Sequence, residues 1–102
     1  MTNSAPVFAA LGDRTRLGLV ARLCNGEPLS ITQLAAGSRV TRQAITKHLH
    51  VLEGAGLVQG FRQGRRQLWE LNPQQLVAAR RYLDVISQQW DEALARLKAA
   101  VE

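Results

Sequence analysis

Apolar residues recur in the first part of the chain with the spacing of short helices. A first, brief helix is predicted by three apolar residues, Val7, Phe8 and Leu11. Asp13 is a suitable N-cap for a second helix, and Asn25-Gly26 is expected to end it. The apolar stripe of this second helix comprises Leu17, Leu19, Val20, Leu23 and Cys24.

The next two predicted helices have the spacing of a helix-turn-helix motif. Ser30 and Gln33 have the spacing of a capping box, so they predict a short third helix that Gly37 ends. Thr41 is expected to cap a fourth helix. Its inward face has the i, i+3, i+4, i+7 spacing of Ile45, His48, Leu49 and Leu52. Its outward face is polar and carries Arg42, Gln43, Thr46, Lys47 and His50.

That polar face suits the edges of DNA bases. An α-helix fits the major groove, where Arg and Lys suit guanine, Gln suits adenine and a Thr methyl group can meet a thymine methyl group. The preceding short helix and tight turn match the geometry in which the first helix crosses the backbone and the second enters the groove. We therefore expect Arg42, Gln43, Thr46 and Lys47 to discriminate bases.

After Gly56 the period changes to two, which predicts a two-stranded hairpin. Phe61 lies before the turn, which Gly64 supplies, and the alternating residues after it are Gln67, Trp69 and Leu71. Three arginines at the tip, Arg62, Arg65 and Arg66, could reach phosphates or a narrow minor groove. The hairpin is thus predicted to be a wing. The alternative is a basic hairpin that serves only solubility.

The last segment predicts a long helix with a seam for a second helix. Asn72-Pro73 opens it. One row of residues seven apart comprises Leu76, Leu83, Trp90 and Leu97, and the neighbouring row comprises Ala79, Ile86, Ala93 and Ala100. Leu94 and Val101 widen the stripe, and no other long helix is predicted, so we expect a second copy as partner. The alternative is a helix that folds back on its own domain.

The positive charge of the chain is concentrated in the predicted DNA-binding segment. The net charge is +5, and residues 39 to 66 hold six basic residues against the single acid Glu53. Elsewhere seven basic residues balance seven acids. Such a patch is expected of a nucleic-acid binder, because Lys and Arg that neutralise phosphates release condensed counterions. The alternative is a solvated charged surface.

The length of 102 residues predicts one domain, residues 1–102, mainly α with a small β-hairpin. The helix-turn-helix is expected at about 31–55, the wing at about 57–71 and the dimerisation helix at about 74–100. A domain this small buries a limited core, which favours oligomerisation. The opening residues lack the pattern of a signal peptide or membrane span, so the cytoplasm is expected.

The residues that carry catalysis or bind metals are sparse. His48 and His50 are two apart and point to different sides of a helix, so they cannot chelate one ion, and His48 is expected in a core or hydrogen-bonded position. Trp90 is expected to pack, and Cys24, the single cysteine, is expected to be a buried, inert thiol, with redox sensing the minority alternative. We expect no metal, no cofactor and no enzyme activity.

The sequence resembles the ArsR family of bacterial winged-helix repressors over nearly the whole chain. The first helices are matched by VFAALGDRTRLGLVARL, the third by LSITQLA, the recognition helix by ITKHLHVLEGAGLV and the wing by FRQGRRQLWEL. The resemblance implies a homodimer joined by its first and last helices, DNA read by the fourth helix, and repression relieved by an effector. It puts at DNA-facing positions Thr41, Arg42, Gln43, Thr46, Lys47 and His50.

The chain also departs from the family pattern. Arg14 stands where the family often has proline, and Ser38-Arg39 where the turn usually carries leucine and glycine. The cysteine pairs and the Asp and His ligands of metal-sensing members are missing, so the resemblance is to a member without those motifs.

The leading hypothesis is a sequence-specific DNA-binding transcriptional regulator, a homodimeric repressor on an inverted-repeat operator. Arg39 and the three wing arginines are predicted to contact phosphates. One alternative is a winged-helix module that docks on an acidic protein without sequence-specific DNA binding, but the outer face lacks aromatic or aliphatic anchors. Another is a regulator that responds to an unidentified small organic effector bound between subunits.

Overall fold

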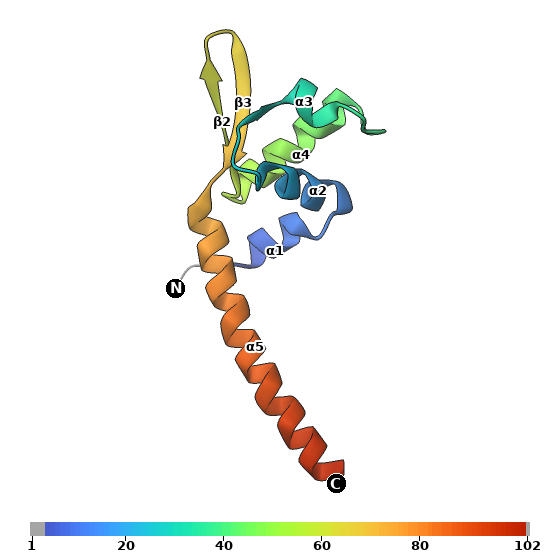
Figure 1. The fold of residues 1–102 in the computed structure, drawn as a ribbon, viewed down its shortest axis with the longest axis vertical. Helices are drawn as coiled ribbons and strands as arrows, with labels where there is room; N and C mark the ends of the chain where they lie inside the picture. The colour runs from blue at the N-terminus through green and yellow to red at the C-terminus, as the bar shows by residue number, and fades with distance from the viewer. Residues whose placement is uncertain (1–3, 102) are drawn as a thin grey trace.

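The computed structural model of the protein describes residues 4–101. Figure 1 shows a small helical domain, a β-hairpin that projects from it, and one long helix that leaves it. The elements of this part are α1 (Ala5–Leu11), α2 (Arg14–Leu23), β1 (Leu29–Ser30), α3 (Ile31–Ala35), α4 (Arg42–Gly54), β2 (Val58–Gln63), β3 (Arg66–Leu71) and α5 (Pro73–Val101). None of these helices combines the length and the apolar character needed to cross a membrane.

Side-chain caps begin α2, α3 and α4 where the sequence predicts them. The carboxylate of Asp13 accepts a hydrogen bond from the backbone N–H of Arg16 at 3.0 Å. Ser30 and Gln33 form both hydrogen bonds of the capping box. The Thr41 hydroxyl accepts from a backbone N–H of the first turn of α4 at 3.1 Å. These caps satisfy backbone donors that would otherwise lack partners, and the three predictions are confirmed.

The core lies where the helices of the domain meet the sheet. Ile45, Leu49 and Leu52 are 1%, 0% and 0% exposed, so the inward face predicted for α4 is confirmed. They belong to one apolar cluster with residues of the other helices and of the strands, such as Leu34 and Val58. Because three successive turns of α4 are buried on one side, the rotation of this helix about its axis is fixed, and the opposite face must point to solvent.

The buried face of α2 is narrower than predicted. Leu19, Val20 and Leu23 are buried, but Leu17 is 54% exposed and Cys24 is exposed. At 100° per residue, positions 17 and 24 lie roughly 90° or more from the middle of the face formed by the other three. The prediction that Cys24 is buried is therefore wrong.

The hairpin is part of a three-stranded antiparallel sheet rather than a two-stranded one. The strand order is β1-β3-β2. In β1, Leu29 pairs with Trp69 and Ser30 pairs with Leu68. The predicted hairpin of β2 and β3 is confirmed. The third strand, β1, was not predicted, because a two-residue strand has no periodicity to reveal it and exists only through its pairing with β3.

The pattern of burial along β3 also differs from simple alternation. Trp69 is 3% exposed, but its neighbour Leu68 is also buried, 4% exposed, on the other face, opposite Phe61. Trp69 lies across from Gly60, and a Cβ atom at that glycine would be 3.1 Å from the indole ring. The absent side chain of Gly60 therefore leaves the space in which the indole ring packs on the strand.

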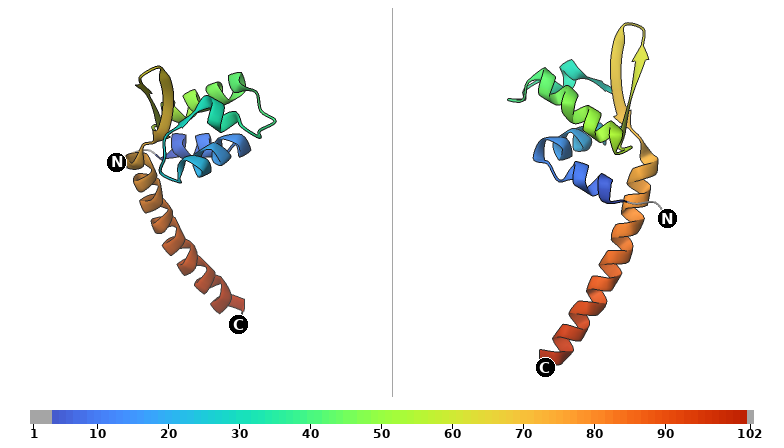
Figure 2. Two further views of the ribbon diagram at one scale, coloured as in Figure 1. Left: turned by 45° about the horizontal axis from the view of Figure 1, so that its top comes forward. Right: turned by 180° about the vertical axis from the view of Figure 1, so that it is seen from behind.

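Helix α5 begins in the domain and then extends beyond it, as both views in Figure 2 show. Ala79 is 6% exposed in the domain core, and Leu76 packs against that core. These two residues, predicted for the intersubunit seam, therefore pack within their own protomer. The radius of gyration is 17.4 Å, whereas a compact chain of this length has a value of about 13 Å. The later turns of α5 account for this elongation.

Candidate nucleic-acid interface

The outward face of α4 presents few side chains, and not all of them are free to hydrogen bond. Gln43 and Lys47 are exposed and line one hollow together with Thr41, Ala44 and Thr46. The Thr46 hydroxyl donates to the carbonyl of Arg42 at 2.9 Å, within the helix. The Thr41 hydroxyl is engaged as the N-cap. Gln43 and Lys47 are thus the long polar side chains of this hollow, and Thr46 has its methyl group left for contact.

His50 lies farther along α4 and contacts the base of the wing. Its ring meets that of Trp69 edge to face, with centroids 5.7 Å apart and an interplanar angle of 82°. Its Nδ1 atom is 3.6 Å from Oε1 of Glu53, whose other oxygen accepts from the backbone N–H of Gly60 at 3.3 Å. His50 therefore helps to join α4 to β2 and β3, and it lies apart from the hollow lined by Gln43 and Lys47.

The wing projects from the sheet and carries its arginines at the tip. The β2–β3 register ends at the pair Gln63 and Arg66, which leaves Gly64 and Arg65 as a two-residue loop. Gly64 has φ of 64°, a left-handed conformation that glycine adopts without steric cost, so the predicted turn is confirmed. Arg62, Arg65 and Arg66 are all exposed.

The structure brings Arg42 next to the wing. Arg42, Arg65 and Arg66 line a groove of about 470 Å³ between the start of α3, the start of α4 and the hairpin. Arg42 was predicted to read bases, and nothing in the chain's spacing indicated that it meets residues more than twenty positions away. Ser30, Thr32 and Gln33 share this groove and were not among the predicted site residues.

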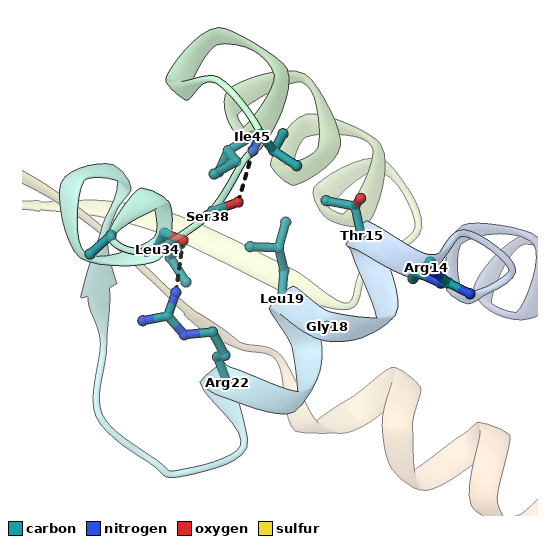
Figure 3. A pocket seen from close by; sticks show the side chains of 11 residues that line it. Arg14, Thr15, Gly18, Leu19, Arg22, Leu34, Ser38 and Ile45 are labelled. Carbon is teal, nitrogen blue, oxygen red and sulfur yellow. Dashed lines mark hydrogen bonds between the residues drawn. The ribbon is translucent and has the colours of Figure 1, made fainter.

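A side chain of α2 stabilises the end of α3, next to the turn between α3 and α4. Figure 3 shows the Arg22 side chain extending from α2 toward Leu34, and its guanidinium donates to the carbonyls of Leu34 at 2.7 Å and Gln33 at 2.9 Å. Ser38 stabilises the turn itself, since its hydroxyl accepts from the backbone N–H of Val40 at 3.0 Å. Arg22 therefore satisfies carbonyls at the end of α3 and fixes its position relative to α2, a role that the sequence did not reveal.

Arg39 lies in the same turn. It is exposed and forms no hydrogen bond or ion pair with other residues of the described part. The turn contains Gly37 with φ of 72°, a left-handed conformation that glycine adopts without steric cost.

His48 joins the recognition helix to the start of α2. Its Nδ1 atom is 3.4 Å from Nη1 of Arg16 and 3.9 Å from the carboxylate of Asp13. This agrees with the hydrogen-bonded position predicted for His48. The pKa of Asp13 is lowered, chiefly because its carboxylate accepts the backbone hydrogen bond of Arg16. Among residues 4–101, no cluster of three or more His, Cys, Asp or Glu side chains could hold a metal ion.

A short helix, a tight turn, an exposed polar helix and a basic hairpin together define a winged helix-turn-helix DNA-binding protein. Comparisons with known proteins agree with this class. Residues 11–60 match a protein-family model described as a helix-turn-helix domain. The HTH-type transcriptional regulator Rv2034 of Mycobacterium tuberculosis is 41% identical over 87 residues, which cover 85% of this chain and 78% of that protein.

Comparison with solved structures shows that the similarity extends to the fold. The ArsR-like transcriptional regulator from Rhodococcus sp. RHA1 is 37% identical, with a TM-score of 0.77 over 97% of this chain and 92% of that one. The winged helix-turn-helix domain of Mb0332 from Mycobacterium bovis, described as homodimeric, is 22% identical, with a TM-score of 0.66 over 83% of this chain and 78% of that one. The chain belongs to the ArsR-like family of helix-turn-helix transcriptional regulators.

Proposed function

We propose that the protein is a homodimeric repressor that binds an inverted-repeat operator through α4 and the wing of each subunit. The observation that supports the dimer is the exposed apolar surface of the later turns of α5. Leu83, Trp90 and Leu97 are 50%, 66% and 67% exposed, and Leu94 and Val101 beside them are 58% and 83% exposed. An apolar surface of this kind on an isolated helix favours a partner that covers it.

A second copy is the partner that accounts for this surface best. Leu83, Trp90 and Leu97 recur every seven residues, a spacing typical of helix pairs, and Ile86, Ala93 and Ala100 form the neighbouring row. Phe8 of α1 and Tyr82 of α5 bring their rings to 5.9 Å, so α1 flanks the start of the same surface. The homodimer of the Mycobacterium bovis domain supports this assignment.

Within the proposed complex, α4 reads bases and the arginines hold phosphates. Gln43 and Lys47 are the exposed long side chains of the hollow on α4, so they are assigned to base edges. Arg39 and the wing residue Arg62 are assigned to phosphates, because they are exposed cations at the margins of the recognition surface. In a dimer, two recognition helices about 34–36 Å apart would enter successive major grooves of an inverted repeat.

Binding to duplex DNA tests the proposal directly. The purified protein is titrated by fluorescence anisotropy against a duplex from upstream of its own coding region and against a scrambled duplex, over a salt series. We expect a preference for the native duplex, and affinity for both duplexes that falls as salt rises. No binding at low salt would contradict the assignment.

One substitution separates base reading from backbone contact. Gln43→Ala is expected to weaken binding to the preferred duplex by about 1–3 kcal/mol and to leave binding to the scrambled duplex nearly unchanged. Equal losses on both duplexes would remove Gln43 from the base-reading set. In vitro transcription from the same upstream region, with and without the protein, tests repression, and screening small organic molecules for release of the DNA tests for an effector.

A further inference from the structure

The groove between α3 and the wing holds an unusual concentration of unpaired positive charge. Arg42, Arg65 and Arg66 line it from two separate parts of the chain. None of them forms an ion pair with a carboxylate in the part of the chain that the structure describes, and no acidic residue lines the groove. Three like charges gathered without a counter-charge favour an anion between them.

The neutral side chains of the groove also favour an acceptor-rich ligand. The side-chain oxygen of Gln33 accepts from the backbone N–H of Ser30 at 2.9 Å and from Nη2 of Arg66 at 3.4 Å. Since the oxygen is engaged in this way, the amide nitrogen of Gln33 is left as a donor. Together with the guanidinium groups it makes the groove a set of hydrogen-bond donors, which suits the oxygens of a phosphate.

The position of the groove selects the source of that phosphate. In the DNA complex proposed above, α4 occupies a major groove and the wing reaches the adjacent minor groove. The sugar-phosphate backbone that separates these two grooves must then pass between α4 and the wing. The groove opens between the same two elements, whereas Gln43 and Lys47 line a different hollow on α4.

We propose that Arg42, Arg65 and Arg66, with Gln33, clamp one backbone phosphate of each operator half-site. Arg42 is then a phosphate-binding residue rather than the base-reading residue expected from its place on α4. This inference rests on the DNA-binding function proposed above and assigns one phosphate to one groove. It also connects α3, α4 and the wing through a single ligand, because each contributes a side chain to it.

Neutral phosphates test the clamp with the wild-type protein. A preferred duplex is first selected from a random library, and each backbone phosphate of one half-site is then replaced in turn by an uncharged methylphosphonate. We expect one replacement, at the junction of the major and minor grooves, to weaken binding about tenfold. A scan in which no replacement near that junction weakens binding would overturn the clamp.

Variants then identify the residues that hold this phosphate. In Arg42→Gln and Arg66→Gln, the sensitive replacement should cost clearly less than tenfold, since one of the arginines that hold this phosphate is already lost. Arg62→Gln removes an equal charge from the same hairpin but outside the groove, so it should keep the full tenfold effect. In Arg42→Gln and Arg66→Gln, the slope of log affinity against log salt should become shallower by at most about 0.9 for each half-site phosphate, or at most about 1.8 per dimer.

Three outcomes separate the possible failures. If the wild-type protein does not distinguish the selected duplex from a scrambled one, the proposed function fails together with the clamp. If it does, but Arg42→Gln alters base preference at one operator position and keeps the phosphate sensitivity, the clamp alone is overturned. If inorganic phosphate displaces DNA far better than chloride at equal ionic strength, and Arg42→Gln removes this difference, the groove is a site for free phosphate instead.

Discussion

Trp90→Ala is expected to weaken self-association strongly without harming the helix that carries it. The Trp90 side chain is 66% exposed on the part of α5 that extends beyond the domain. A tryptophan presents at most about 250 Å², so about 165 Å² of Trp90 is open to a partner. Alanine has the highest helix propensity, so the substitution removes the indole ring and leaves the helical preference of α5 intact or improved.

The size of the effect follows from the area that a second subunit can cover. If the partner covers half of that exposed area, the substitution removes roughly 80 Å² of buried tryptophan surface from each subunit. At 25 cal/mol per Å², this loss weakens association by about 2 kcal/mol per subunit. A symmetric dimer contains the residue twice, which gives about 4 kcal/mol. The dimer dissociation constant should therefore rise about a thousandfold.

Sedimentation equilibrium over a wide concentration range measures this constant. Gln88→Ala is the matched control, because position 88 lies two residues away on the opposite side of the predicted seam. Circular dichroism should give the same helical content for both variants at concentrations where each variant is in a single oligomeric state. A Trp90→Ala dimer as tight as that of the control would refute the assignment of α5 as the dimer interface.

Three further predictions concern stability and use the same purified chain. Gly18→Ala should stabilise the domain by about 0.5–1 kcal/mol in urea unfolding, because this glycine lies inside α2 and a Cβ atom there would meet no atom within 4 Å. The same change at Gly60 should destabilise by roughly 1–3 kcal/mol, because the new Cβ would lie 3.1 Å from the indole of Trp69, and an equal sign for the two glycines would contradict this reasoning. Asp13→Asn keeps a capping side chain but removes the charge. Because folding lowers the pKa of Asp13, its ionised form contributes stability above its unfolded pKa, and this contribution is lost as pH falls through the folded pKa. The stability advantage of the wild type over Asp13→Asn should therefore shrink below about pH 4. A stability advantage that grows on acidification would contradict this role of the Asp13 charge.

Much of the recognition motif could be predicted from local rules. Ser30, Thr41 and Asp13 cap helices because their side chains bond to backbone N–H groups only three residues ahead. The inward face of α4 follows from the helical period, and Gly64 marks the wing turn because glycine adopts positive φ at little cost. Each of these signals depends on residues that are neighbours in the chain.

Predictions that depended on distant partners were less complete. β1 is two residues long and takes its identity from pairing with β3. The burial of Cys24 was predicted from the width of an apolar stripe, but the neighbours of α2 cover only part of that stripe. Ala79 shares its heptad row with residues farther along α5, yet it packs in its own domain because the first turns of the helix lie against the core.

By itself, the sequence determined the N-caps of α2, α3 and α4, the polar outer face of α4, the basic wing and the heptad rows of α5. Only the tertiary structure decided that Arg42 meets Arg65 and Arg66 in one groove, and that Trp69 takes the space beside Gly60. The physical reason is the range of the interactions: capping and periodicity act within one or two turns of the chain. The groove and the packing of Trp69, in contrast, arise where separate elements come together.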